Sequence, residues 1–284
     1  MSLIISFAAA RTGSSRAGQV LRSAGFQYIS EAFAKGRCKL ASNNWHHKED
    51  LAKELNCKPK NLRLSNILAS KYSLTKTASF LQSIHEDVIV EVFPSHLAIK
   101  QLGILSCHSK GIIVIQRILI DQFISMQKVR ETARQDGKMK WGNLDTTSIK
   151  VNLDCNVFRN FLIYQLSYYS FVNAIVSTFE FGDNIAFINY DDWSSRMPNE
   201  QETFLSSKVE TFIRKCNNLC AETMHPSTRL FKQDKNIHWK QSVANSEEFE
   251  QGITQLGIRR LAFLKPLDII KNEDLTLISN AHKS

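Results

Sequence analysis

A short segment of small and hydroxyl-bearing residues, ARTGSS at positions 10–15, directly follows the first apolar run of the chain. In a turn between a strand and a helix, successive backbone N–H groups point to one spot, and the helix N-terminus adds positive potential. Gly13 allows close backbone approach, Ser14 and Ser15 offer hydroxyl donors, and Arg11 supplies a full charge. This anion loop therefore predicts a phosphate or sulfate site. It is not a Walker A loop, because the lysine of GxxxxGK[ST] is missing.

A second arginine follows another apolar run. Arg117 comes after the run at 111–116, and Ser125 lies eight residues further on, with Gln122 between them. Eight residues are a little over two helical turns, so Ser125 returns near the helix face at which Arg117 begins. An arginine at a strand end and a hydroxyl on the next helix predict a second anion clamp.

The anion loop resembles a motif of sulfotransferases that use 3′-phosphoadenosine 5′-phosphosulfate (PAPS). FAAARTGSS is similar to their 5′-phosphosulfate-binding loop, and the arginine form is typical of bacterial carbohydrate sulfotransferases of the trehalose and nodulation types. The resemblance implies a P-loop-like nucleotide-binding sulfotransferase fold with PAPS as co-substrate. It also implies that the phosphosulfate is held by Arg11, Thr12, Gly13, Ser14 and Ser15.

The second clamp resembles the element of the same family that binds the 3′-phosphate. QRILIDQFIS is similar to the trehalose-type pattern R-R-D-x-x-x-Q-A-x-S, in which Arg117, Gln122 and Ser125 match and three other positions depart. The resemblance implies that Arg117 and Ser125 bind the 3′-phosphate.

Looser matches continue along the chain. Residues 133–141 and 187–193 are similar to later family segments, the second with Asp191 where the family has Glu. Residues 230–239 resemble a late Arg-Gln loop near the nucleotide, which implies cofactor contacts for Lys232 and Gln233.

An acceptor hydroxyl needs a general base, because it is a poor nucleophile until its proton is removed. Glu31 lies in a segment similar to the one that carries the base in the trehalose-type family, which implies this role for Glu31. Histidine is the base in the eukaryotic cytosolic branch of sulfotransferases. Four histidines are therefore alternatives, His96 foremost because it follows an expected strand: His46, His47, His96 and His108.

Strand and helix patterns alternate along the chain and must position these residues. Apolar runs at 3–8 and 111–116 predict parallel strands buried on both faces, and further strands are expected at 87–93 and 185–188. Helices are expected at 16–24, 48–56, 75–84, about 94–105, 119–135, 154–178 and 201–221. The pattern predicts an α/β fold with a central parallel sheet flanked by helices, and ligands at the carboxyl ends of the strands. We expect one domain over residues 1–284, with helical insertions at about 40–85 and toward the C-terminus.

Composition limits the partners. The net charge of +9 suits anionic ligands, but the basic residues form no long run, so nucleic acid is not expected as a partner. The six cysteines are dispersed, which indicates a reduced, cytoplasmic protein. Cys216 and Cys220 have helical spacing but no second pair, so no metal is expected. No apolar run is long enough to span a membrane, and the apolar N-terminus has no basic region of a signal peptide.

The most economical interpretation is a PAPS-dependent sulfotransferase acting on a hydroxyl of a carbohydrate, glycolipid or other small alcohol, as a possible homodimer. Catalysis would rest on Arg11 and Glu31. Two alternatives remain open at this point: a nucleotide-dependent phosphotransferase using Asp191 and Asp192 for magnesium, and a non-catalytic anion- or nucleotide-binding module on the same fold.

Overall fold

The computed structural model describes residues 2–23, 25–94, 96–136, 146–178, 184–194 and 238–271. Its centre is a sheet of five parallel strands in the order β2-β3-β1-β4-β5. The strands are β1 (Leu3–Phe7), β2 (Gln27–Ile29), β3 (Val88–Val92), β4 (Gly111–Gln116) and β5 (Ile185–Asn189). The expected α/β class with a flanked parallel sheet is thus confirmed.

The three central strands form because most of their residues are apolar and both faces of the sheet are covered. All residues of β1, β3 and β4 are buried, as parallel strands covered by helices on both sides require. In register, Phe7 pairs with Val92 on one side and with Val114 on the other, so these three strands end close together. The loops that leave the strands at these ends therefore meet at one sheet edge.

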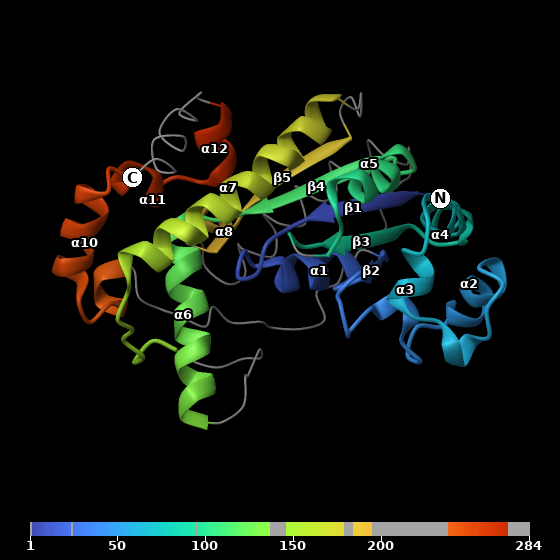
Figure 1. Ribbon diagram of the computed structural model, residues 1–284, viewed down its shortest axis with the longest axis horizontal. Coiled ribbons are helices and arrows are strands. Elements are labelled where there is room, and N and C mark those ends of the chain that lie inside the picture. The colour runs from blue at the N-terminus through green and yellow to red at the C-terminus, as the bar shows by residue number, and fades with distance from the viewer. Residues whose placement is uncertain are drawn as a thin grey trace.

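Helices cover both faces of the sheet (Figure 1). On one face, α1 (Ser14–Ser23) packs through Ala17, Val20 and Leu21 against alternate strand residues such as Ile4. The opposite face carries the largest core cluster, to which α4 (Lys71–Ser83), α5 (Ile99–Cys107) and α7 (Cys155–Thr178) contribute together with other helices.

A second hydrophobic cluster is formed largely by helices that lie on the left of Figure 1. It is rich in rings, with Phe123 and Phe158 centred 5.1 Å apart and Phe158 and Phe249 5.5 Å apart. Helices α6 (Leu119–Asp136), α10 (Ser246–Gln255) and α11 (Arg259–Ala262) pack around it with the first half of α7. This cluster anchors the helix that carries the second clamp.

The segment between β2 and β3 is helical, as the sequence indicates for 40–85. It contains η1 (Lys39–Ala41), α2 (Lys48–Glu54), η2 (Pro59–Asn61), α3 (Leu64–Ile67) and α4. Towards the C-terminus, α8 (Tyr190–Ser194) and η3 (Trp239–Ser242) precede α10, and α12 (Pro266–Lys271) follows α11. The expected helix at 201–221 lies outside the described residues. No helix in the described part of the chain combines the length and apolarity that a membrane crossing needs.

The chain leaves the two adjacent strands β1 and β4 in opposite directions. From β1 it passes through α1 to β2, and from β4 it passes through α6 and α7 to β5 on the other side of the sheet. In open parallel sheets, the crevice at such a switch in strand order is where ligands bind. Both predicted anion clamps lie at this point.

Candidate functional site

The anion loop is a tight turn between β1 and α1. Thr12 bonds back to the Ala9 carbonyl through its amide (3.3 Å) and its hydroxyl (2.8 Å). Arg16 and Ala17 both donate their amides to the Gly13 carbonyl at 3.1 Å, which starts the helix. The loop places Arg11 at φ 68° and Gly13 at φ 83°. Such a conformation costs a non-glycine residue about 1–2 kcal/mol, so the surrounding contacts hold Arg11 in place.

The second clamp contacts the anion loop directly. Arg11 donates from Nε to the Ser125 hydroxyl at 3.0 Å, across 114 positions of sequence. Gln122 donates from Nε2 to the Ala10 carbonyl at 2.8 Å, and Arg117 donates to the Arg11 carbonyl at 3.3 Å. Three hydrogen bonds thus tie the loop after β1 to the start of α6, and both clamps form one site.

Two guanidinium groups share this site. Burial, and then the nearby Arg117, lower the pKa of Arg11. The surrounding protein therefore destabilises the charged form of this side chain. Arg117 stacks over the Tyr190 ring at 4.3 Å and approaches Asp191, with 3.9 Å between Nε and Oδ1. Two cations that are both largely buried, as these are, favour an anion between or beside them.

Asp191 holds the second clamp rather than pointing to a ligand. Its Oδ2 accepts the Ile118 amide at 2.8 Å, while Oδ1 faces Arg117. Asp192 accepts from Asn189 at 2.8 Å and from Lys265 at 3.3 Å. Both carboxylates are therefore engaged with the protein, which weakens their case as magnesium ligands.

The hydroxyls of the anion loop point in different directions. The Thr12 side chain is buried and bonded to Ala9, and the buried Ser14 bonds to Glu91. Ser15 is exposed at the first turn of α1, at the positive end of the helix dipole. Ser15, the loop amides and Arg11 are thus the groups that can face an anion, while Thr12 and Ser14 brace the loop.

Glu91 lies beneath the loop, where the sequence pattern indicates only a buried strand. Its side chain is 2% exposed, and its Oε1 accepts from the Tyr28 hydroxyl at 2.7 Å. Its Oε2 accepts the Glu31 amide at 3.4 Å, so Glu91 joins the anion loop to the turn after β2. Burial raises the pKa of Glu91 and raises that of Tyr28 well above its usual value. A carboxylate in the middle of the strand VIVEV, with apolar residues on both sides, is the sequence signal for Glu91.

Glu31 lies on the turn after β2, at φ 52°. Its side chain is 30% exposed, and its carboxylate forms an ion pair with Arg37, with 3.9 Å between Oε1 and NH2. Its backbone is connected to the anion loop through Glu91, so both belong to one edge of the sheet.

The four alternative histidines do not fit the role of base as well. Burial lowers the pKa of His96 to about 4, and its Nδ1 already accepts the Phe93 amide at 3.2 Å. His108 is the C-terminal cap of α5, before β4 begins. His46 bonds to Gln27 at the start of β2, at the opposite sheet edge, with His47 next to it.

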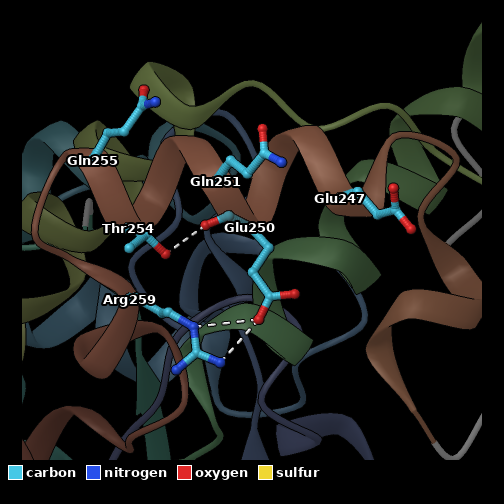
Figure 2. Close-up of a pocket in the computed structure, with 6 residues that line it drawn as sticks. All are labelled: Glu247, Glu250, Gln251, Thr254, Gln255 and Arg259. Carbon is cyan, nitrogen blue, oxygen red and sulfur yellow. Dashed lines mark hydrogen bonds and ion pairs between the residues drawn. The ribbon is translucent and has the colours of Figure 1, made fainter.

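Lys232 and Gln233 lie outside the described residues, as do most positions of the looser matches at 133–141 and 230–239. A hollow of about 440 Å³ lies elsewhere, on the exposed side of α10 (Figure 2). Its central Glu250 is neutralised by Lys240 and by Arg259 at 2.9 Å, and the hydrogen bond from Lys240 lowers its pKa most. This hollow therefore presents surface ion pairs, and none of its lining residues belongs to the anion loop or to the second clamp.

No protein-family model matches the chain, and no curated protein matches it at a significant level. The function therefore has to be argued from the site itself.

Proposed function

We propose that the protein is a PAPS-dependent sulfotransferase with the P-loop-like fold of that family. It would transfer a sulfuryl group to a hydroxyl of a carbohydrate, glycolipid or other small alcohol. The observation that carries the proposal is the 3.0 Å hydrogen bond from Arg11 to Ser125, because it brings two separately predicted anion clamps into one site. PAPS carries anionic groups at its 5′ and 3′ positions, and so needs two such clamps side by side.

The residues present fit this co-substrate. Arg11, the loop amides and Ser15 would hold the phosphosulfate, and Arg117 with Ser125 would hold the 3′-phosphate. The lowered pKa of Arg11 supports this assignment. A bound anion would compensate both for the loss of water around Arg11 and for its repulsion from Arg117. Lys232 and Gln233 stay proposed nucleotide contacts by resemblance alone.

In the reaction, PAPS supplies the sulfuryl group. The acceptor oxygen bonds to sulfur while the bond from sulfur to the 5′-phosphate breaks, which leaves adenosine 3′,5′-bisphosphate. Arg11 would neutralise the charge that develops on the departing oxygen, and Glu31 would take the proton of the acceptor hydroxyl. Glu91 would fix the position of Arg11 relative to Glu31, because it bonds to Ser14 in the anion loop and to the Glu31 amide.

A nucleotide-dependent phosphotransferase is a weaker candidate. That reaction needs magnesium, and both oxygens of Asp191 already hold Arg117 and the start of α6. The anion loop also lacks the lysine that a Walker A loop directs at the phosphates.

A non-catalytic anion-binding module is the second candidate, and one observation favours it. The Glu31 carboxylate is engaged by Arg37, so the proposed base is not held ready beside Arg11. Such a module would use the same two clamps but would release PAPS unchanged.

Two measurements separate these functions. Calorimetry should show adenosine 3′,5′-bisphosphate binding much more tightly than adenosine 5′-monophosphate, and ATP with magnesium binding no better than the monophosphate. Turnover of sulfur-labelled PAPS with a panel of sugars, glycolipids and small alcohols then tests catalysis. Tight bisphosphate binding without any labelled product would favour the module, and a preference for ATP would refute the assignment.

A further inference from the structure

Two histidines and a glutamate meet at the amino-terminal edge of the sheet. His46 and His47 precede α2, and Glu86 lies in the turn that leads into β3. Gln27, the first residue of β2, donates to His46 Nε2 at 3.0 Å. We call His46, His47 and Glu86 the His–His–Glu cluster. Helix α2, directly after the two histidines, lies on the right of Figure 1, whereas α6 lies on the left.

The donor atoms of the cluster already lie near one another. One ligand atom from each of the three residues falls within 4.8 Å of the others, and His46 Nε2 is 3.7 Å from Glu86 Oε1. Ligand atoms around a tetrahedral zinc ion are about 3.3 Å apart, given bonds of about 2.0–2.2 Å. Small side-chain rotations, with loss of the hydrogen bond from Gln27, would complete that geometry.

The surroundings of the cluster contain buried polar atoms that lack partners. Within the described part of the chain, His47 Nε2, Gln27 Oε1 and Trp45 Nε1 are buried with no hydrogen bond. Buried polar atoms are almost always paired, so three such atoms at one place need an explanation. A bound metal ion would satisfy His47 directly, and Gln27 Oε1 could complete the ligand set.

Neighbouring aromatic side chains pack against the His47 ring. Trp45 and Phe80 pack edge-on against His47, with ring centroids 5.9 and 6.4 Å away. These contacts fix the orientation of the His47 ring beside His46, whose ring centroid lies 4.1 Å away.

We propose that the His–His–Glu cluster binds one divalent transition-metal ion of the zinc class. Two imidazoles and one carboxylate are typical ligands for zinc, whereas magnesium and calcium prefer oxygen ligands alone. The ion links three segments that are distant in sequence: the start of β2 through Gln27, the loop before α2, and the turn before β3. At this location the metal ion would have a structural role and would stabilise the edge strand β2.

The metal site is separate from the anion site. In the sheet register, Gln27 of β2 pairs with Val88 of β3, which pairs with Leu3 at the start of β1. The anion loop follows Phe7, at the opposite end of β1. Four residues of strand correspond to about 13 Å. The inference therefore does not depend on the proposed function, and neither site supplies ligands to the other.

The test is zinc binding by the full chain after treatment with a chelator, followed by calorimetry. Wild type should bind one Zn²⁺ at this site, and His46→Ala and Glu86→Gln should each weaken binding at least about 100-fold. The His46 and Glu86 side chains are 61% and 47% exposed, so these variants should stay folded. His108→Ala is the matched histidine control, and the double variant Cys216→Ser/Cys220→Ser controls for thiol binding. Both controls should bind Zn²⁺ like the wild type.

Three outcomes would overturn the site. They are unchanged Zn²⁺ affinity in His46→Ala, loss of binding in the cysteine variant, and equal thermal stabilisation of wild type by Mg²⁺ and Zn²⁺. Affinity for adenosine 3′,5′-bisphosphate should be the same in His46→Ala and wild type. If the proposed sulfotransferase function fails, the zinc result stands, since no nucleotide enters that measurement.

Discussion

The Arg11 guanidinium donates to the Ser125 hydroxyl at 3.0 Å, and so joins the loop after β1 to the helix after β4. We assign these two groups to different anions of one cofactor. A bisphosphate must therefore compete with their hydrogen bond and separate them. The hydrogen bond from Gln122 is accepted by a backbone carbonyl, that of Ala10, and involves neither Arg11 nor Ser125. It can therefore remain when the bisphosphate binds and keep the two clamps aligned.

Arg11→Ala should abolish transfer and weaken PAPS binding. A charge-assisted hydrogen bond is worth about 1.5–3 kcal/mol, which corresponds to roughly 10- to 150-fold in affinity. Calorimetry with adenosine 3′,5′-bisphosphate and turnover of labelled PAPS measure the two effects. Arg134→Ala is the matched control, because this arginine is 79% exposed on α6. If turnover and affinity were both unchanged in Arg11→Ala, the central assignment would be refuted.

Arg117→Ala and Ser125→Ala should selectively reduce recognition of the 3′-phosphate. The wild type should bind adenosine 3′,5′-bisphosphate much more tightly than adenosine 5′-monophosphate, and both variants should narrow that difference about tenfold or more. Ser167→Ala, which removes an exposed hydroxyl on α7, should leave it unchanged. Equal affinity of the wild type for the two nucleotides would contradict the assignment of this clamp.

The central strands could be predicted from the sequence because each consists mostly of apolar residues, many of them β-branched. The runs at 3–8, 87–93 and 111–116 contain β1, β3 and β4. Strand β2 was not predicted, since QYI is only three residues long and begins with a polar one. Its place at the sheet edge depends on pairing with β3, and a contact between such distant segments leaves no local pattern.

The candidate site could be predicted only in part, for a similar reason. Arg11 and Ser125 carry local patterns, a loop after a strand and an eight-residue offset, and the structure brings them together. The contacts of Glu91 depend on strand register, and the His–His–Glu cluster depends on loops that meet in space. Their partners lie 40 or more positions away, so sequence spacing could not identify them.

Gly18→Ala should destabilise the protein and disturb the support of the anion loop. A Cβ at this position would lie 2.5 Å from the Tyr28 ring, whose hydroxyl bonds to Glu91. Overpacking of this kind costs about 1–3 kcal/mol in the free energy of unfolding, measurable by urea denaturation. Gly103→Ala on α5 is the control, because a Cβ there meets nothing within 4 Å and should stabilise the helix by up to about 1 kcal/mol. Equal stability of the two variants would contradict this packing argument.

Glu91→Gln should change the pH dependence of stability. The folded-state pKa of Glu91 is raised above the reference value of 4.5 mainly by burial. Between those two pKa values the folded protein binds more protons than the unfolded chain, so stability falls as pH rises through this window. The glutamine side chain of the variant carries no charge at any pH, and it can keep the contact with Tyr28 as a hydrogen bond.

The measurement is urea denaturation of wild type and Glu91→Gln at several values between about pH 4.5 and pH 8. The free energy of unfolding of the variant, relative to wild type, should increase with pH. All other titrating groups are common to both proteins and cancel in the difference. A difference that stays constant over this range would show that Glu91 has no raised pKa in the folded protein.

Glu31→Gln tests the proposed base. A positioned general base contributes about 10²–10⁴-fold to the rate, so kcat should fall by such a factor while affinity for adenosine 3′,5′-bisphosphate stays nearly intact. The substitution keeps the size of the side chain and removes only its charge and basicity. The decrease should be similar for different acceptors, because every hydroxyl must lose its proton.

Arg37→Ala separates the base from its ion pair. Arg37 is the neighbour that engages the Glu31 carboxylate at 3.9 Å, and it lies 64% exposed, so its removal should leave the fold intact. If Glu31 is the base, Arg37→Ala should retain far more activity than Glu31→Gln, because the carboxylate remains. If Glu31→Gln keeps its kcat and raises only the KM for the acceptor, Glu31 binds the acceptor and another group removes the proton. His96 would then be a poor substitute at neutral pH, since burial lowers its pKa to about 4 and leaves it a weak base.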